Sequence, residues 1–477
     1  MFLVKNKIFS IKLFIYLFVL FSLGCDKKKQ VDKPNIIFIL ADDMGYADFE
    51  LIGKSTKTPN LNNLANEGIF FKNFYAAGPN CSPSRVGFMT GKSPAKVGMY
   101  SYRPPDHPLH LPENEITLPE ILKSVGYKTA HFGKWHLGCL PQNPKLNHPQ
   151  PNQHGFDFSF GTENNAIPSH LNPINFIKNG EKVGEVKGYS CQILAQESIN
   201  WIEKNKEDPF FLYIAFHEPH TVIASPPNLV RNYKNESKKD REYLANIDNL
   251  DLAIGKVLKY LNKKKLDDNT IIIFSSDNGS YRAASNGTLR AVKSYLYEGG
   301  IKVPGIISWS KLKTSKRVVN TAAGLVDILP TLCDILKIAP PNDLDGSSLL
   351  PILNGKEFKR NKPLYWFFYR TSPEIAIRLE NHMLFGVDDD SITRTHRFSS
   401  QDLDYIKTIK LNNYELFDLI NDHSQEKNIF ANHKKKDSLK LLIDNKLKEI
   451  QDNLYPWDNL PAENNKPKRL KKNWVKY

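Results

Sequence analysis

The stretch that organises the chain spans residues 80–91 and reads NCSPSRVGFMTG. Cys81 is followed by Pro83, then by Arg85 and an apolar turn that closes on Gly91. Proline suits the first turn of a helix, because its missing N–H is not needed there. The pattern predicts a loop that runs into a helix, with Cys81 at the helix N-terminus, where free N–H groups favour an anion. Arg85 lies one turn on and can reach back to Cys81. We therefore expect a reactive residue that handles a negatively charged group.

Two apolar runs, at residues 35–41 and 269–276, end abruptly in polar side chains. Their unbroken hydrophobicity and β-branched residues predict strands buried on both faces, as in a parallel sheet covered by helices. Open α/β sheets place ligands at the carboxyl ends of such strands. Each of the two polar pairs, taken alone, could also form an ordinary turn without any ligand. Together they offer four oxygen ligands, which suit Ca²⁺ or Mg²⁺: Asp42, Asp43, Asp277 and Asn278.

Two further predicted strands also end in polar residues. Residues 209–216 are followed by the sequence HEPH at 217–220. Its histidines are three apart with a proline between them, so this is not the helical motif of the zinc proteases. The strand predicted at 127–132 is followed by Lys134 and His136. Residues two apart in an extended chain share a face, so this lysine and histidine can bind an anion and move a proton.

The remaining pattern predicts an α/β fold with a large, mainly parallel mixed sheet sandwiched by helices. Helices are expected at residues 116–125, 190–204, 239–261 and 322–336, and further strands at 69–75 and 301–309. From residue 356 short aromatic strands and one helix at 434–451 predict a small C-terminal subdomain with an antiparallel sheet. We expect a large domain at 34–355 and this subdomain, with a basic tail, at 356–477.

Residues 141–173 are rich in proline, asparagine and histidine and show little periodicity. This composition predicts a loop, which we expect to lie over the site and contact the substrate. Its histidines His148, His154 and His170 fit no metal-binding spacing, so we expect them to be structural.

Composition excludes several classes of protein. The chain has 477 residues, 40% of them hydrophobic and 24% charged, which indicates a folded protein of more than one domain. The net charge of +14 favours an anionic membrane surface or a polyanionic substrate. No zinc-finger spacing or RNA-binding aromatic motif occurs, so nucleic acid is not an expected partner.

The first 25 residues have the pattern of a signal peptide. Lys5, Lys7 and Lys12 flank an apolar run at residues 13–23, which is short for a membrane-spanning helix. The run ends in Gly24-Cys25, like a bacterial lipoprotein signal. We expect export to the periplasm or outer membrane, with lipid on Cys25 as the membrane anchor and residues 26–33 as a polar tether. Ordinary cleavage and an uncleaved anchor remain alternatives, because Ser22 stands where such signals usually carry leucine.

Cysteine use does not predict a disulfide-stapled fold. Apart from Cys25 and Cys81, only Cys139, Cys191 and Cys333 remain, enough for at most one disulfide. Stability must therefore come from a large core.

The motif at residues 81–91 resembles the signature of the type I sulfatases, Cys-x-Pro-x-Arg followed by an apolar pair and Thr-Gly. Other family motifs recur here in the family's order. They are Asp-Asp-x-Gly at 42–45, Gly-Tyr-x-Thr…Gly-Lys-x-His at 126–136, a strand-end histidine at His220, Asp277-Asn278-Gly279, and a segment at 289–300 in which Lys293 matches a sulfate-binding lysine. His131 matches no motif position. The resemblance implies an alkaline phosphatase-like fold and an exported bacterial carbohydrate sulfatase.

The resemblance also implies a mechanism. In this family the signature cysteine is oxidised to formylglycine (3-oxoalanine) by a maturation enzyme, and the hydrated aldehyde attacks the sulfur of a sulfate ester. For this chain it implies that Cys81 is so modified and joins Asp42, Asp43, Asp277 and Asn278 around the cation, which polarises the sulfate. Lys134 and Lys293 would bind the sulfate, and His217 is a second candidate contact. His220 would protonate the leaving alcohol, while Arg85 and His136 would hold the hydrate.

Two alternatives remain open. The chain could be a phosphodiesterase or phosphonate monoester hydrolase of the same superfamily, although Lys134, Lys293 and Asn278 favour sulfate. It could also be a non-catalytic lipoprotein that binds sulfated glycans, although the full set of polar residues argues against this. The expected substrate is a sulfated polysaccharide or oligosaccharide, either algal, such as ulvan or carrageenan, or a glycosaminoglycan.

Overall fold

The structure is a computed structural model that describes residues 33–53, 55–140, 146–312, 317–369, 373–388 and 397–462. The predicted signal peptide with Cys25, most of the tether, and the basic tail lie outside the described residues. Residues from Asn35 onward belong to one compact unit. Within the described part of the chain, no helix combines the length and the hydrophobicity needed to cross a membrane.

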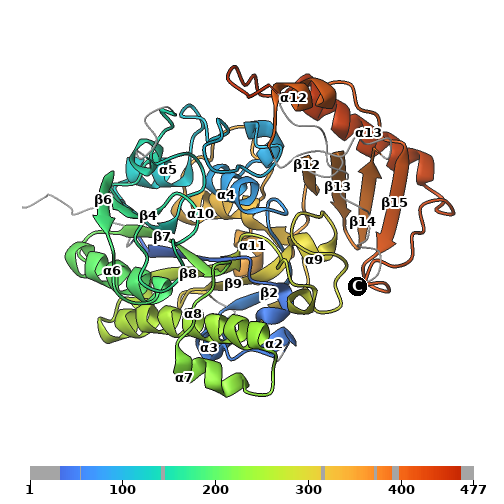
Figure 1. Cartoon of the computed structure of the whole chain (residues 1–477). Coiled ribbons are helices and arrows are strands. Elements are labelled where there is room, and N and C mark those ends of the chain that lie inside the picture. Colours follow the sequence, from blue (N-terminus) through green and yellow to red (C-terminus); the bar gives the residue numbers. More distant parts are fainter. Residues whose placement is uncertain are drawn as a thin grey trace, which may run out of the picture. The chain divides into compact units, whose positions relative to one another are not determined.

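A large mixed sheet forms the centre of this unit (Figure 1). Its central strands pair in parallel, whereas β9 is antiparallel to both of its neighbours and β5 and β6 form an antiparallel edge. The strand order is β10 (Arg317–Val319), β2 (Ile69–Tyr75), β9 (Lys302–Ser308), β8 (Thr270–Ser276), β1 (Asn35–Asp42), β7 (Phe210–Pro219), β3 (Lys128–Lys134), β4 (Phe158–Thr162), β5 (Phe176–Lys178) and β6 (Glu181–Gly184), with β11 (Ala323–Gly324) paired to β2.

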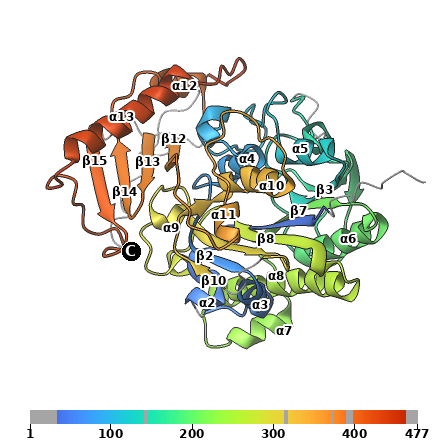
Figure 2. The same ribbon diagram turned by 180° about the vertical axis from the view of Figure 1, so that it is seen from behind.

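Helices cover both faces of the sheet, because its central strands are apolar on both sides. Along β1, Ile36 and Phe38 point into one core, and Ile37 and Ile39 point into the other. The longer helices of one face are α4 (Cys81–Thr90), α5 (Leu118–Ser124) and α10 (Ile328–Leu336). Those of the other face are α3 (Pro59–Glu67), α6 (Ser190–Asn205) and α8 (Lys238–Lys263) (Figure 2). Single-turn helices are α2 (Glu50–Gly53), α7 (Pro227–Val230), α9 (Glu298–Ile301) and α11 (Leu350–Leu353).

A second, antiparallel sheet follows near the C-terminus. It consists of β12 (Leu364–Tyr369), β13 (Pro373–Leu379), β14 (His382–Val387) and β15 (Asn413–Asp418), accompanied by α12 (Ser400–Ile406) and α13 (Lys436–Asp452). Its core is continuous with one core of the large sheet, and the Trp366 indole N–H donates to the Ala76 carbonyl at 2.8 Å. The predicted fold class is confirmed. The predicted domain boundary at residue 356 stays a prediction.

The structure corrects one sequence-based expectation and answers one question that the sequence left open. The segment at 141–173 is not a loop throughout, because β4 lies within it and pairs in parallel with β3. With only five residues and an internal glycine, β4 shows too little periodicity to be recognised in the sequence. Cys139, Cys191 and Cys333 are each free and buried, so no disulfide forms among them.

Candidate active site

The register of the parallel strands brings the predicted acidic residues together. In the pairing of β1 with β8, Ala41 lies opposite Ser276, so Asp42 and Asp277 come next on the two strands. The Asp277 N–H donates to the Ala41 carbonyl at 3.1 Å. The Asp43 N–H then donates to Oδ1 of Asp277 at 3.2 Å, with the Asp43 backbone in the left-handed region (φ +68°). Two strand ends that are far apart in sequence therefore present three buried carboxylates at one edge of the sheet.

The strands on the other side of β1 bring the basic residues to the same place. β7 pairs with β1, and its end at Pro219 is followed by His220. β3 pairs with β7 at Gly133, where a Cβ would lie 1.9 Å from the Ala215 carbonyl oxygen and φ is +96°. Only glycine fits this close approach, which positions Lys134 at the end of the strand.

Cys81 lies at the N-terminus of α4, as predicted, and is buried. Its sulfur lies 3.3 Å from Oδ1 of Asp42 and 3.3 Å from Nζ of Lys293. Arg85 does not reach back to this sulfur. Its guanidinium donates to Asp277 at 2.7 Å and to the Lys134 carbonyl at 2.7 Å, so it fixes the two strand ends relative to α4.

Each lysine of the site is paired with a different carboxylate. Lys134 donates to Asp42 at 2.8 Å, and Lys293 donates to Asp43 at 2.5 Å. The amide nitrogen of Asn278 also donates to Asp43, at 2.7 Å. We call the group of residues defined by these contacts the Cys81 cluster: Asp42, Asp43, Cys81, Arg85, Lys134, Asp277, Asn278 and Lys293.

Burial and charge shift the protonation of the cluster in opposite directions. Burial alone would raise the pKa of Asp42, but Lys134, His220 and Arg85 together hold it well below its usual value. Burial and the neighbouring Asp42 raise the pKa of Asp277 to about 6. Burial, Asp277 and Asp42 likewise raise the pKa of the Cys81 thiol. Cys81 is therefore held as a neutral thiol, a poor nucleophile.

The cluster fits a hard cation. Ligand atoms of Asp42, Asp43, Cys81 and Asp277 all lie within 4.8 Å of one another. Oδ1 of Asn278 is buried and has no hydrogen-bond partner, so it is available as a further oxygen ligand. A soft sulfur ligand does not suit Ca²⁺ or Mg²⁺, whereas an oxygen atom at position 81 would. The donor set thus matches the predicted metal site best if Cys81 carries oxygen instead of sulfur.

Two histidines border the cluster. Nε2 of His136 lies 2.9 Å from the Arg103 carbonyl oxygen, which can only accept, so Nε2 carries the proton. Nδ1 of His136 is buried without a partner and is the basic nitrogen. In His220, Nδ1 lies 2.7 Å from the Thr221 carbonyl oxygen and Nε2 lies 3.6 Å from Asp43. Burial lowers the pKa of both imidazoles.

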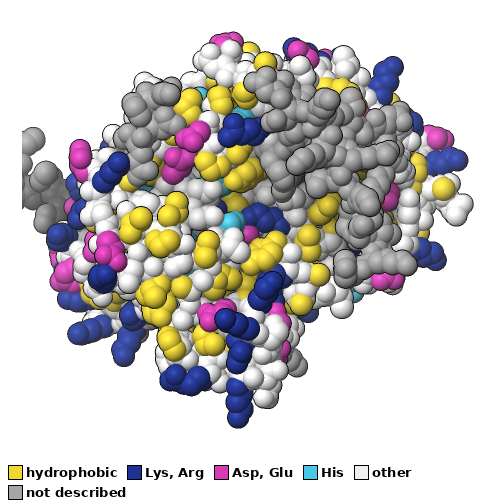
Figure 3. Space-filling view, in the orientation of Figure 1, with side chains coloured by type: hydrophobic (Ala, Val, Ile, Leu, Met, Phe, Trp, Pro, Cys, Tyr) yellow, Lys and Arg dark blue, Asp and Glu magenta, His cyan; other side chains and the backbone are white. Residues whose placement is uncertain are grey.

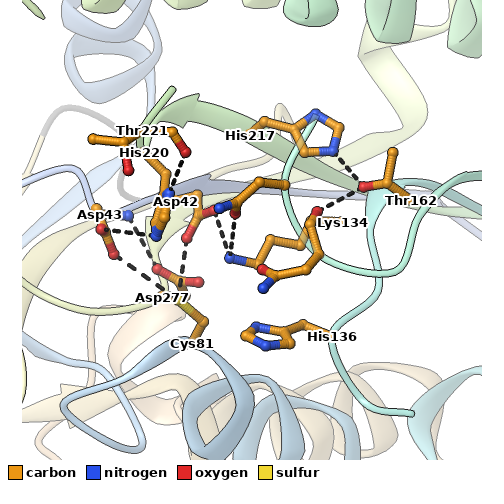
Figure 4. Close-up of polar contacts among 12 residues, drawn as sticks. Asp42, Asp43, Cys81, Lys134, His136, Thr162, His217, His220, Thr221 and Asp277 are labelled. Atoms are coloured by element: carbon orange, nitrogen blue, oxygen red, sulfur yellow. Dashed lines mark hydrogen bonds and ion pairs between the residues drawn. The ribbon is translucent and has the colours of Figure 1, made fainter. Parts of the chain in front are cut away.

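The structure does not bring His217 into the cluster. Its Nε2 bonds the Thr162 hydroxyl at 2.7 Å and its Nδ1 bonds the Ser190 hydroxyl at 2.6 Å. The side chain is fully buried and both ring nitrogens are occupied; Figure 4 shows the contact with Thr162. His217 therefore supports the end of β7 rather than facing a substrate.

One contact was missed from sequence. Oδ1 of Asn165 accepts from Lys134 at 3.4 Å, in the turn that follows β4. Polar residues that follow a predicted strand indicate several of the other site residues. The sequence does not predict β4, so it gives no such signal for Asn165. Asn165 is partly buried, and the side chains of His220 and Lys293 are 19% and 12% exposed. In Figure 3, a hollow on this face carries histidine and basic side chains.

These features define an α/β enzyme with a buried, anion-handling site at the strand ends of its central sheet, and comparisons with known proteins identify its family. Residues 34–338 match the sulfatase family, and residues 291–453 match the C-terminal region of N-sulphoglucosamine sulphohydrolase. The chain therefore belongs to the sulfatase family and is a sulfuric ester hydrolase.

The chain is similar to several known sulfatases over most of its length. The N-acetylgalactosamine-6-sulfatase of Homo sapiens is 34% identical over 384 residues, which cover 73% of this chain and 70% of the human protein. The steryl-sulfatase of Homo sapiens is 27% identical over 458 residues, which cover 77% of each chain. The crystal structure of Ps i-CgsB in complex with k-i-k-neocarrahexaose matches with a TM-score of 0.74 and 27% identity, and covers 89% of this chain and 94% of that one.

Proposed function

We propose that this sulfatase hydrolyses sulfate esters on a sulfated polysaccharide or oligosaccharide, with formylglycine formed from Cys81 and a bound calcium ion. The observation that carries the proposal is the setting of Cys81. Its neutral thiol lies between the Asp42 carboxylate and the Lys293 ammonium, among oxygen ligands that suit a hard cation. A thiol so placed is a poor nucleophile and a poor ligand, whereas the hydrated aldehyde supplies oxygen for both roles.

Two similar proteins support a sulfated sugar as the substrate. One is an N-acetylgalactosamine-6-sulfatase, and another was crystallised with k-i-k-neocarrahexaose. A glycosaminoglycan and an algal polysaccharide such as carrageenan or ulvan both fit this chemistry. The net charge of +14 favours such polyanions, because it attracts them from solution.

The lysines of the cluster can bind the sulfate group. Lys293 lies within 3.3 Å of the Cys81 sulfur, so an anion bound beside residue 81 is within its reach. Lys134 is held on the same edge of the sheet by Asp42 and Asn165. Fixed ammonium groups in a buried site offset the charge that develops on the sulfuryl oxygens without reorganisation. A calcium ion held by the carboxylates would add Lewis-acid polarisation of the sulfate.

The two bordering histidines divide the proton transfers. Nε2 of His220 lies 3.6 Å from Asp43, whose negative charge opposes the lowering of the imidazole pKa by burial, and His220 is thereby placed to carry a proton to the leaving alcohol. Nδ1 of His136 carries a lone pair, because its Nε2–H is donated to the Arg103 carbonyl. His136 can therefore accept a proton from a hydroxyl at residue 81 when sulfate is expelled. His217 has no part in either step.

We further propose that the protein is exported and lipid-anchored through Cys25, in the periplasm or at the outer membrane. The basic start and short apolar run of residues 1–25 support this. An exported location would bring the enzyme to extracellular polysaccharides and away from nucleic acid. A formylglycine-generating enzyme would be needed as its maturation partner.

The test is sulfate release by protein co-produced with a formylglycine-generating enzyme and supplied with Ca²⁺. Algal and animal sulfated glycans would be assayed beside phosphate esters, with Cys81→Ala as the blank. We expect sulfate release from one class of glycan and none from the blank. Turnover of phosphate esters without sulfate release would contradict the proposal and favour the phosphodiesterase alternative.

A further inference from the structure

A second charged region lies beside the small sheet and shares no residue with the Cys81 cluster. A cleft of about 860 Å³ opens between the end of the β13–β14 hairpin, the start of α13 and the chain after β10. Its volume is in the range of ligand-binding pockets. We call it the C-terminal basic cleft and define it by its basic side chains: Lys359, Arg360, Arg378, His382, His433 and Lys435.

The most informative of these residues is Arg378, on β13. It is 6% exposed, and its Nε is buried without a hydrogen-bond partner. Nη1 makes one long hydrogen bond, at 3.4 Å, to the His382 carbonyl. The guanidinium also lies 6.0 Å from the centre of the Tyr75 ring. Among the residues that the structure describes, no carboxylate forms an ion pair with it. The Tyr75 phenol is also a side-chain hydrogen-bond partner of Arg378 and in turn donates to Glu298 at 2.8 Å. Nε of Arg378 still has no partner, and a buried cation without a direct ion pair is costly, so an anion bound in the cleft would stabilise it.

The other lining residues extend this positive site to the surface. Lys359 and Lys435 are exposed on two sides of the cleft. Among the lining residues that the structure describes, Glu380 is the only acidic one, so lysine and arginine outnumber acids there. Arg360 differs from Arg378, since it is paired with Asp327. The cleft therefore combines a buried guanidinium whose Nε has no hydrogen-bond partner with a cationic rim, an arrangement that attracts anions of some length.

The cleft also has apolar walls. Leu379, Leu416, Leu439 and Pro363 line it together with the ring of Phe358. Apolar walls with a few charged groups suit a ligand that has both C–H faces and anionic substituents. A sulfated sugar has this character, whereas a free inorganic anion would leave the walls unused.

We propose that the C-terminal basic cleft is a second, non-catalytic binding site for a sulfated oligosaccharide, with Arg378 bound to a sulfate group and Lys359 and Lys435 bound to neighbouring ones. The proposal rests on the proposed function for the class of glycan. A polymer held at the cleft would present its other sulfates to the Cys81 cluster at a raised effective concentration. The cleft would thus favour long chains over single sugars.

Binding would be measured by calorimetry on the full chain carrying Cys81→Ala, so that no turnover disturbs the titration. The probes are a long sulfated galactan oligosaccharide and its desulfated counterpart. The double substitution Lys359→Gln with Lys435→Gln should weaken binding of the sulfated probe about five- to tenfold, and Arg378→Gln should do so at least as strongly. The desulfated probe should bind no more tightly to the parent than to these variants.

The matched control is Lys448→Gln, which removes an exposed lysine of α13 outside the cleft. It should leave the affinity unchanged. Unchanged binding in the double variant would overturn the proposal, and so would an equal loss in Lys448→Gln, which would indicate a general charge effect. Because both lysines of the double variant are exposed, its folding is not at risk if Arg378→Gln fails to fold.

A second readout separates this proposal from the proposed function. In protein co-produced with the formylglycine-generating enzyme and without the Cys81→Ala substitution, the double variant should keep the parental turnover of a small aryl sulfate. If no glycan releases sulfate but the cleft variants still lose affinity, the cleft stands and the proposed function fails. If glycans are desulfated and the cleft variants bind like the parent, the proposed function stands and the proposal of a second binding site in the cleft fails.

Discussion

The Cys81 cluster and the C-terminal basic cleft both gather cationic side chains, but they hold them against different partners. In the cluster, Lys134 and Lys293 lie 2.8 Å and 2.5 Å from carboxylates, and these carboxylates lie at the end of the paired strand β1. In the cleft, Arg378 is buried without a carboxylate, and the lysines lie at the surface. The first arrangement positions groups for chemistry, whereas the second offers charge for binding. The parallel sheet explains the difference, because its strands end side by side.

The largest effect should come from Cys81 itself. Cys81→Ser should lower sulfate-ester turnover more than about a thousandfold, because a serine offers one hydroxyl and cannot form the hydrate from which sulfate is eliminated. Inorganic sulfate release under single- and multiple-turnover conditions would measure this. A serine variant with turnover close to the parent's would contradict the role of the aldehyde and would make residue 81 an ordinary hydroxyl nucleophile.

The next largest effect should separate the lysines of the two regions. Lys293→Gln should reduce kcat/KM for a small aryl sulfate about a hundred- to a thousandfold, because it removes a fixed charge beside the reacting sulfate. Lys359→Gln, the matched lysine of the cleft, should leave this value unchanged. Steady-state kinetics on both variants checks the prediction. Equal losses would show that the two regions do not differ as proposed.

Metal removal should destabilise the cluster but not the cleft. Without a cation, the buried carboxylates Asp42, Asp43 and Asp277 repel each other. A ligand at a hundred times its Kd stabilises by about 2.7 kcal/mol, so adding Ca²⁺ to chelated protein should raise the melting temperature by several degrees. Asp277→Asn should lose most of this response. A melting temperature that does not respond to Ca²⁺ would argue against a metal at this site.

A smaller effect concerns the core that supports the cluster. His131, on β3, packs against Trp135, Phe156 and Tyr213. Burial lowers its pKa to about 3, from about 6.5 in the unfolded chain. The stability due to its neutral form is therefore complete above the unfolded pKa and is lost as the pH falls toward the folded one. Between about pH 6.5 and about pH 5 this residue should cost about 2 kcal/mol of folding free energy.

Denaturant unfolding across this pH range tests the prediction. His131→Phe should flatten the decline in stability, whereas substitution of the exposed His423 by Gln should not. An unchanged slope in His131→Phe would show that other groups, among them the buried His148 and His154, account for the acid sensitivity.

Much of the fold and the cluster followed from the sequence, because buried parallel strands that end in polar residues have a definite geometry. The rule placed Asp42, Asp277 and Lys134 at one edge before any register was known. The same geometry predicts that His217 and His220 point to opposite faces of the sheet, since side chains three residues apart along an extended chain do so. The structure shows that His217 indeed points away, toward Ser190 and Thr162.

Other features had no local signal in the sequence. Asn165 was missed because β4 is short, and its place beside Lys134 depends on pairing with β3. The sequence predicts nothing unusual about Arg378, because it does not show that this side chain is buried without a direct ion pair. Both depend on contacts between segments far apart in the chain, which residue patterns do not specify.

We propose above all that Cys81 acts as formylglycine in the hydrolysis of sulfate esters. The most direct measurement is mass spectrometry of the peptide that contains residue 81, made on preparations with increasing amounts of the maturation enzyme, beside sulfate release by the same preparations. We expect turnover to rise in proportion to the fraction of aldehyde and to be absent from protein that carries only the thiol. Full sulfate release by protein with unmodified Cys81 would contradict it.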